Sequence, residues 1–365
     1  MLPAWYPTAR QPLSGVFVRE HARAAAALGH RMVVIVDEGQ CEDVHGLFAL
    51  KEEHDGVLRI FRLSYRPSSG TLAYLPGVLA VRRRLAREGT PADILHAHVH
   101  RMGWGAVLAG SFLRRPVVIS EHSSEWTQRT ITRSALFRAR IAFRRAALVC
   151  PVSAALQEAI ERYGVKARFR VVPNAVDTRV FRPPERLPRG PATRLVNVAL
   201  HTEVKGLDVL LRAFATLAGR RPELTLDLVG EGSLTPQLKQ LAGELGLGER
   251  VRFLGAAHPA EVADVLRGSH VFVLASRSET MGVVVAEALC CGLPVAATDV
   301  GGVPEIVHGE GVLAPAGHVE GLAAAIEVVL DRYPRFDRAA IARRAASRFS
   351  LEAVGRQWDE IYRSV

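Results

Sequence analysis

The sequence predicts an α/β protein with two doubly wound halves, each a parallel sheet covered by helices. Three observations lead to this. The chain has 365 residues, which exceeds one ordinary core and suits two domains. Short apolar runs alternate with amphipathic ones along the chain, which is typical of parallel β-α-β units. A proline-rich stretch, Phe181–Pro191, interrupts the alternation near the middle.

The first half holds five apolar runs that read as buried strands. They cover residues 31–36, 93–97, 116–120, 147–150 and 169–172. The alanine-rich stretch Val18–Leu28 predicts an amphipathic helix before them. The opening is unusual because only Met1 and Leu2 precede Pro3, and proline is poorly suited to a central strand. A truncated first strand and a misassigned start both remain open.

The alternation resumes after the prolines, which cannot continue a helix and so mark a linker. Five further strands are expected at 195–200, 224–229, 251–254, 271–274 and 294–297, and helices at 206–217 and 261–266. We therefore expect an acceptor-binding domain over 1–182 and a nucleotide-sugar-binding domain over 191–349, as named by the resemblance given below. The amphipathic end of the chain, residues 350–365, is expected to pack back on the first domain. Its apolar face carries Leu351, Val354, Trp358 and Ile361.

Composition excludes several classes of protein. No apolar stretch of about 18 residues is free of charge, and the opening lacks the pattern of a signal peptide. Four cysteines without a C-x-x-C pair argue against a disulfide scaffold and a zinc site, and favour the cytoplasm. Aromatic residues make up only 6%, which argues against a nucleic-acid binder. No G-x-G-x-x-G follows a predicted strand, which argues against a dehydrogenase.

The most informative segment is residues 276–295. A loop carries Glu279, a helix begins near Gly282 and ends at Gly292, and Glu287 lies eight residues after the first glutamate. At most about 12 Å separates the two carboxylates, which is too far for them to share a proton or a metal. They could hold the two ends of an elongated ligand whose anion faces the helix start, such as a nucleotide diphosphate sugar. The alternative is a surface glutamate and a structural salt bridge.

This segment resembles the E-x7-E signature of the retaining GT-B glycosyltransferases of family 4. Other stretches resemble motifs of that family in the same order along the chain. They are residues 14–20, 96–98, 120–122, 172–181, 204–211, 229–232 and 301–306. The resemblance implies two Rossmann-like domains facing across a cleft. It also implies transfer of a sugar from a nucleotide diphosphate sugar to a hydroxyl of a glycan or lipid-linked acceptor, in cell-envelope or exopolysaccharide assembly.

The resemblance also assigns roles to residues. Glu279 binds the donor sugar, Lys205 neutralises the diphosphate, and His122 contacts the transferred sugar near the reacting carbon; these three are the catalytic candidates. The other donor-binding candidates are Glu287 for the ribose, the backbone N–H groups of Met281, Gly282 and Val283, Glu231 and Gly232 beside the base, and Arg277. Gly15 and His98 are the acceptor-side candidates.

One position departs from the family. An arginine usually stands five residues before the lysine, and here that residue is Leu200. Since two cations stabilise a leaving diphosphate better than one, Arg277 or His201 could substitute, or activity is weak. The resemblance further implies retention, with the donor phosphate as base. No D-x-D motif is present, and neither a metal nor a cofactor is expected.

Two arginine-rich stretches lie in the first half. Residues 128–145 carry six arginines and no acid among apolar residues, and Arg82–Arg84 with Arg87 follow Leu72, Tyr74 and Leu75. Either the arginines form a solvated face, or they dock the protein on the anionic inner face of the plasma membrane. Two further functions stay open: a GT-B-like sugar-nucleotide epimerase or phosphorylase, and a non-enzymatic nucleotide-sugar binding protein.

Overall fold

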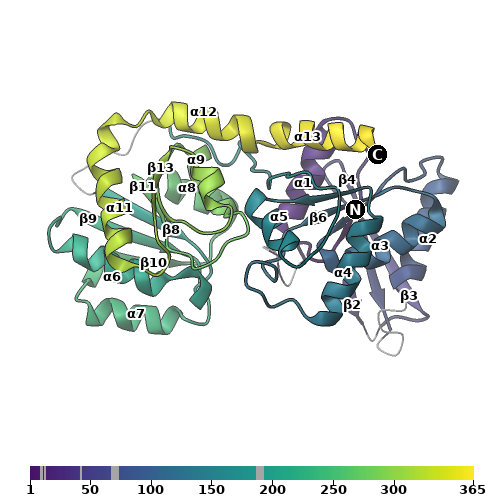
Figure 1. The fold of residues 1–365 in the computed structure, drawn as a ribbon, viewed down its shortest axis with the longest axis horizontal. Coiled ribbons are helices and arrows are strands. Elements are labelled where there is room, and N and C mark those ends of the chain that lie inside the picture. Colours follow the sequence, from purple (N-terminus) through teal and green to yellow (C-terminus); the bar gives the residue numbers. More distant parts are fainter. Residues whose placement is uncertain (9–10, 12–13, 42, 67–73, 186–192) are drawn as a thin grey trace. The chain divides into compact units, whose positions relative to one another are not determined.

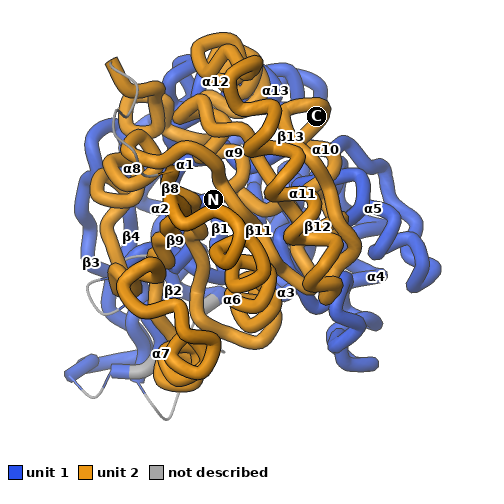
Figure 2. Tube along the Cα trace, turned by 90° about the vertical axis from the view of Figure 1, so that its left-hand side faces the viewer, with its two compact units in different colours: residues 1–175, 351–365 blue, residues 176–350 orange. Residues whose placement is uncertain are grey.

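The computed structural model describes residues 1–8, 11, 14–41, 43–66, 74–185 and 193–365. The chain forms two compact units (Figure 2). Unit 1 contains Met1–Ala175 and Leu351–Val365, and unit 2 contains Val176–Ser350. Most of the expected linker, residues 186–191, lies outside the described residues, as does Leu72 of the second basic stretch.

Seven strands form the described part of the sheet of unit 1. The hydrogen-bonded orders are β2–β4–β3 and β1–β5–β6–β7. The two parts join because the Met1 amino group donates to the Val33 carbonyl and the Ile35 N–H donates to the Met1 carbonyl. The strands are β1 (Leu2–Pro3), β2 (Val33–Gln40), β3 (Phe48–Asp55), β4 (Leu58–Tyr65), β5 (Leu95–His98), β6 (Val117–Glu121) and β7 (Leu148–Pro151).

Helices cover both faces of this sheet (Figure 1). One face is covered by α1 (Val16–Ala27) and α13 (Leu351–Ser364), which pack together over a core that includes Val34, Ile60 and Val118. On the other face, α2 (Tyr74–Arg87) packs on β3 and β4, and α3 (His100–Leu113) packs on β5 and β6. Two more helices complete the unit: α4 (Arg133–Arg145) beside α3, and α5 (Ala154–Glu161) after β7.

The sheet of unit 2 has six described strands, all parallel, in the order β10–β9–β8–β11–β12–β13. They are β8 (Thr193–Val198), β9 (Leu224–Val229), β10 (Val251–Gly255), β11 (Val271–Leu274), β12 (Val295–Thr298) and β13 (Gly311–Ala314). This strand order and the helices on both faces make each unit a Rossmann-like domain. The prediction of a doubly wound α/β fold is therefore confirmed.

Two groups of helices enclose this second sheet (Figure 1). On one face, α6 (Leu207–Ala218), α7 (Thr235–Glu244) and α11 (Val319–Arg332) bury a leucine- and alanine-rich core. The other face carries α8 (Pro259–Arg267) and α9 (Val283–Cys290), and α12 (Arg338–Phe349) packs on α9. Short elements complete the unit: α10 (Val303–Val307) and the 3₁₀ turns η2 (Glu203–Lys205), η3 (Gly248–Arg250) and η4 (Tyr333–Arg335).

Nine of the ten expected strands exist, and the prediction of a strand at 169–172 is wrong. That segment runs beside β7 and makes a single bridge, between Val149 and Phe169. Its amide groups alternate with those of β7 as far as the bond from Val172 N–H to the Pro151 carbonyl. Proline has no N–H to return the next bond, so the ladder stops.

An antiparallel pair was missed in unit 1. β3 and β4 form a hairpin closed by Gly56 and Val57, with Asp55 opposite Leu58. Gly56 has a positive φ of 60°, which fits the first central position of a type II′ turn. The Asp-Gly pair is the sequence signal that points to this turn.

Candidate functional site

Lys205 and Glu279 form an ion pair in unit 2. The Lys205 Nζ lies 2.6 Å from the Glu279 Oε1, which also accepts a hydrogen bond of 2.8 Å from the Ser276 hydroxyl. Lys205 ends η2 after β8, and Glu279 lies in the loop after β11. Since β8 and β11 are neighbours, both side chains lie at the carboxyl edge of the sheet, where doubly wound folds bind ligands.

Glycines let the backbone close around this pair. Gly206 has a φ of 60°, and a Cβ there would lie 2.1 Å from the Ala275 carbonyl oxygen. A Cβ on Gly301 would lie 1.8 Å from the carbonyl oxygen of Glu279. Both contacts are shorter than any side chain allows, so these turns need glycine. They fix the loop that carries the glutamate against η2 and the turn before α10.

The remaining residues of the E-x7-E segment surround the start of α9. Gly282 has a φ of 86° and precedes Val283, the first residue of the helix. Met281 is buried, and Glu287 is half-buried one turn into the helix. The helix ends as expected, because Gly292 has a φ of 79° and its N–H donates to the Leu289 carbonyl.

The glycine loop after β9 meets the loop after β8. The His201 N–H donates to the Glu231 carbonyl, and the His201 Nδ1 lies 2.8 Å from the Thr235 hydroxyl oxygen. That hydroxyl also accepts a hydrogen bond from the Gly232 N–H. Glu231 and Gly232 are both exposed. They thus lie on a fixed loop at the same sheet edge as Lys205.

The two residues considered as substitutes for the family arginine are already bonded. Arg277 donates two hydrogen bonds to the Asp208 carboxylate, at 3.0 and 2.8 Å, and one to the Glu203 carbonyl. Asp208 raises the pKa of Arg277, which binds the charge more firmly to that carboxylate. His201 is fully buried. Leu200, by contrast, is 63% exposed and leaves room for a longer side chain.

In unit 1, His98 and His122 contact each other at the ends of β5 and β6. The His98 Nδ1 lies 3.1 Å from the His122 Nε2, and the rings are stacked with centroids 5.3 Å apart. His96 stacks on His98 and contacts the Ser120 hydroxyl at 2.8 Å. His21 of α1 packs edge-on against His122. Four buried imidazoles therefore lie at one end of this sheet.

Hydrogen bonds fix the tautomer of His21. The Trp358 indole N–H donates to the His21 Nδ1 at 2.7 Å, so the ring's proton is on Nε2 and faces the Asn174 Oδ1 at 3.1 Å. Burial lowers the pKa of His21 to about 4. Burial also lowers the pKa of His122, and the nearby His21 adds to this while a hydrogen bond from Asn174 opposes it. The cluster is neutral at pH 7.

Gly15 holds the start of α1 against the chain after β1. It has a φ of 68°, and a Cβ there would lie 2.2 Å from the Trp5 carbonyl oxygen. Phe17, in the first turn of α1, has its ring centroid 4.5 Å from that of His122. The glycine loop thus lies beside the histidine cluster.

Sequence reasoning missed three members of this cluster: His21, Asn174 and Trp358. Asn174 follows Pro173 in a motif that was noted without a role for the amide. Trp358 was expected on the apolar face of the last helix, but its N–H bond was not. His21 lies on the buried face of α1, which is the signal that could have identified it.

Among the described residues, no group of three or more His, Cys, Asp or Glu side chains could hold a metal ion. Within the same residues, no helix is long and apolar enough to cross a membrane.

The chain matches two family descriptions. Residues 14–180 match "Glycosyltransferase Family 4", and residues 182–348 match "Glycosyl transferases group 1". A D-inositol 3-phosphate glycosyltransferase of Thermobispora bispora is 30% identical over 322 residues, which cover 80% of this chain and 74% of that protein. A glycogen synthase of Mycobacterium tuberculosis is 27% identical over 378 residues, which cover 95% of this chain and 90% of that protein. A phosphatidylinositol N-acetylglucosaminyltransferase component of Arabidopsis thaliana is 26% identical over 59% of this chain, which spans about half of that protein (48%).

The fold also matches solved structures. Anabaena HepE in complex with UDP aligns over 100% of this chain and 99% of that chain, with a TM-score of 0.77 and 23% identity. This likeness shows the GT-B architecture. Taken with the sequence matches, it identifies the chain as a member of the group 1, family 4 glycosyltransferases with the GT-B fold.

Proposed function

We propose that this glycosyltransferase moves a hexosyl group from a nucleotide diphosphate sugar to a hydroxyl acceptor with retention of configuration. The observation that carries the proposal is the Lys205–Glu279 pair at the carboxyl edge of the sheet of unit 2. HepE was solved with UDP and with UDP-glucose, which supports this class of donor. Cell-envelope or exopolysaccharide assembly is the setting we propose.

In this proposal Lys205 binds the diphosphate and Glu279 binds hydroxyls of the donor sugar. The ammonium group now bonds one carboxylate oxygen, and a diphosphate would offer it a doubly charged partner. The N–H groups of Met281, Gly282 and Val283 would face the same anion at the start of α9. Glu287 would bind the ribose, and Glu231, Gly232 and Arg277 would border the nucleotide.

The histidines of unit 1 act as neutral hydrogen-bonding groups. Since burial lowers the pKa of His122, this ring cannot serve as a cationic acid at pH 7. It would position the transferred sugar, while the leaving phosphate takes the acceptor proton. Gly15 and His98 would contact the acceptor side. Replacing His122 by alanine should therefore lower kcat more than it raises KM.

A membrane-facing role for α4 is part of the proposal. This helix has five arginines and no acid, and Phe137 is 64% exposed among them. A basic helix with an exposed aromatic fits the anionic inner face of a plasma membrane, where lipid-linked acceptors lie. Arg133→Glu with Arg144→Glu should abolish flotation with anionic vesicles and leave flotation with neutral vesicles unchanged. Absence of flotation by the parent protein at moderate salt would contradict this role.

A transfer assay separates the proposed function from its alternatives. Each candidate donor is incubated with and without a sugar or lipid-linked acceptor, and free nucleotide and glycosylated product are measured. Acceptor-dependent product is expected, and its α or β configuration compared with the donor tests retention. Nucleotide release without an acceptor would favour an epimerase. Binding without any turnover, unaffected in biological function by Glu279→Gln, would favour a non-enzymatic binding protein.

A further inference from the structure

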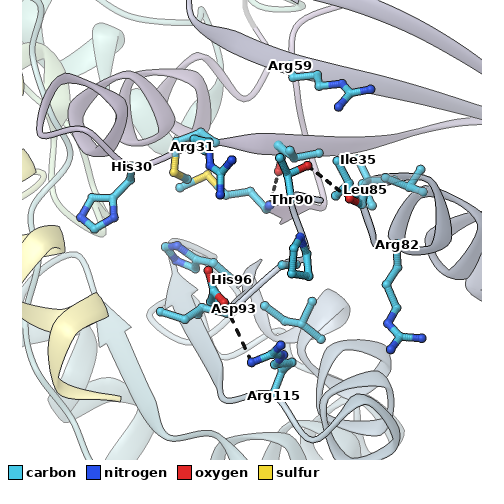
Figure 3. A pocket seen from close by; sticks show the side chains of 18 of the residues that line it. His30, Arg31, Ile35, Arg59, Arg82, Leu85, Thr90, Asp93, His96 and Arg115 are labelled. Atoms are coloured by element: carbon cyan, nitrogen blue, oxygen red, sulfur yellow. Dashed lines mark hydrogen bonds and ion pairs between the residues drawn. The ribbon is translucent and has the colours of Figure 1, made fainter. Parts of the chain in front are cut away.

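Unit 1 contains a cavity of about 540 Å³ that lies apart from the candidate site residues (Figure 3). It lies at the amino ends of β2 and β5, the opposite edge of the sheet from His98 and His122. Met1 and Leu2 form part of its wall. The volume is within the range of ligand pockets in proteins.

The cavity continues the line of β1. This strand has two residues, paired with Ala97 and His98 near the end of β5. Hydrogen bonds from Met1 join it to β2 on its other side. Neighbouring strands lie about 4.8 Å apart, so β2 and β5 are separated by the width of one strand along their whole length. Before Met1, the cavity fills that width.

Backbone groups of both flanking strands face this space. The Leu95 N–H donates to the Pro116 carbonyl on the β6 side, so by alternation the groups of Ile94 and His96 turn toward the cavity. The Arg59 N–H donates to the Met32 carbonyl on the β4 side, so the groups of Arg31 and Val33 turn toward it as well. The walls thus offer the hydrogen-bonding pattern of a parallel strand.

The two faces of the cavity are apolar near the sheet. Val78, Val81 and Leu85 of α2 and Leu113 of α3 line one side, while His30 and Tyr362 line the other. Arginines lie at the rim, where Arg31, Arg82 and Arg115 are exposed (Figure 3). A strand enclosed by helices on both faces takes apolar side chains at every position.

The Met1 amino group lies at the inner end of the cavity. Burial lowers the pKa of this amino group to about 5, and it donates to the Val33 carbonyl. A peptide N–H at this point would keep the hydrogen bond without placing an ionisable group inside the sheet. A residue joined to Met1 would lie opposite Leu95, and the one before it opposite Ile94, by the register of β1 and β5.

We infer that the cavity binds an extended, apolar polypeptide segment of about three residues, joined to the Met1 nitrogen and paired in parallel with β2 and β5. It completes β1 as a full central strand. The occupant is polypeptide because the walls present alternating backbone donors and acceptors from two strands, which an acyl chain cannot satisfy.

The test adds three residues before Met1. One variant carries Val-Leu-Val and a matched variant carries Asp-Gly-Ser, and the melting temperature and amide hydrogen exchange of both are compared with those of the parent chain. The apolar extension should raise Tm by roughly 4 °C or more and slow exchange at Val33 and His96 at least about tenfold. The polar extension should do neither.

Three outcomes would overturn the inference. The first is an apolar extension that leaves Tm and both amides as in the parent. The second is equal stabilisation by the polar extension, since burial in the cavity would then not be the cause. The third is a larger rise in the parent's Tm with decanoate or with free acetyl-Val-Leu-Val-amide than with the joined segment, which would indicate a separate ligand. None of these depends on the activity of the enzyme.

Discussion

The Lys205–Glu279 ion pair must open or be shared when a diphosphate binds. The two side chains are 25% and 10% exposed, so neither is fully hydrated. Changing Glu279 and changing Lys205 should therefore affect nucleotide binding in opposite directions. Glu279→Gln removes the competing charge and should bind a free nucleoside diphosphate at least as tightly as the parent, yet lose turnover because the sugar loses its carboxylate contact. Calorimetric titration with the nucleoside diphosphate, alongside the transfer assay, checks both. Weaker diphosphate binding by Glu279→Gln would contradict this arrangement.

Leu200 offers a gain-of-function test. Its side chain is 63% exposed at the position where the family usually has arginine. Leu200→Arg should leave folding stability within about 0.5 kcal/mol, because exposed positions tolerate substitution. Affinity for the nucleoside diphosphate should rise by about tenfold, as a charge-assisted hydrogen bond contributes about 1.5–3 kcal/mol. Leu200→Gln has a similar length without the charge, and an equal gain there would argue against a phosphate contact.

Gly15 provides a test of close backbone packing. Gly15→Ala puts a Cβ 2.2 Å from the Trp5 carbonyl oxygen, whereas Gly89 has a similar φ of 71° and nothing within 4 Å of such a Cβ. Both changes carry the cost of a positive φ, and only the first adds a clash. In urea denaturation, Gly15→Ala should lose about 2 kcal/mol more stability than Gly89→Ala. Equal losses would show that the loop can move away.

Helices α1 and α13 and strands β5 and β6 meet at the histidine cluster, and this makes the stability of unit 1 sensitive to pH. The folded pKa of His21 is about 4, below the ordinary value of 6.5, and burial also lowers the pKa of His96, His98 and His122. Between pH 6.5 and 4 the unfolded chain binds protons that the folded chain does not. The stability is therefore fully present above pH 6.5 and falls as pH decreases to 4.

Melting curves between pH 4 and 8 measure this effect. His21→Gln should flatten the acid slope, since one neutral buried imidazole is removed, whereas the exposed His45→Gln should keep the parent slope. A parent Tm that does not change between pH 7 and 5 would contradict the neutral cluster.

The elements differ in how well the sequence predicted them. Strands enclosed on both faces, such as β9 and β11, were placed at their observed bounds because they are short apolar runs. β3 was missed because it carries Lys51, Glu52 and Glu53 and only alternate residues are buried. The segment near Phe169 was overpredicted because the effect of Pro151 depends on which strand lies beside it.

The site was less accessible to sequence reasoning than the fold. Lys205 and Glu279 are 74 residues apart, and only the parallel neighbours β8 and β11 bring them together. Spacing alone predicted an elongated ligand at the E-x7-E segment, and the family resemblance supplied the roles. The bond from Arg277 to Asp208 was not foreseeable, because both residues become neighbours only through the turn at Gly206.

At the scale of the whole molecule, the two units are each Rossmann-like, and family membership assigns sugar transfer to the chain as a whole. Lys205 and Glu279 lie in unit 2, and the histidine cluster lies in unit 1 with α13. Changes in unit 1 should therefore alter transfer to the acceptor while leaving nucleotide affinity unchanged. Titration of the His122→Ala variant with a nucleoside diphosphate tests this separation, and a loss of affinity above about fivefold would contradict it.

The most direct test of the account is a thermal-shift titration of the parent, Lys205→Met and Lys166→Met with a panel of nucleoside diphosphates and their sugars. A ligand that binds the folded chain raises its melting temperature. At least one nucleoside diphosphate sugar should stabilise the parent and Lys166→Met, an exposed lysine of unit 1, and Lys205→Met should need roughly 10–100 times more ligand for the same shift. A panel without any stabilising ligand, or equal shifts in all three proteins, would contradict a diphosphate site at Lys205.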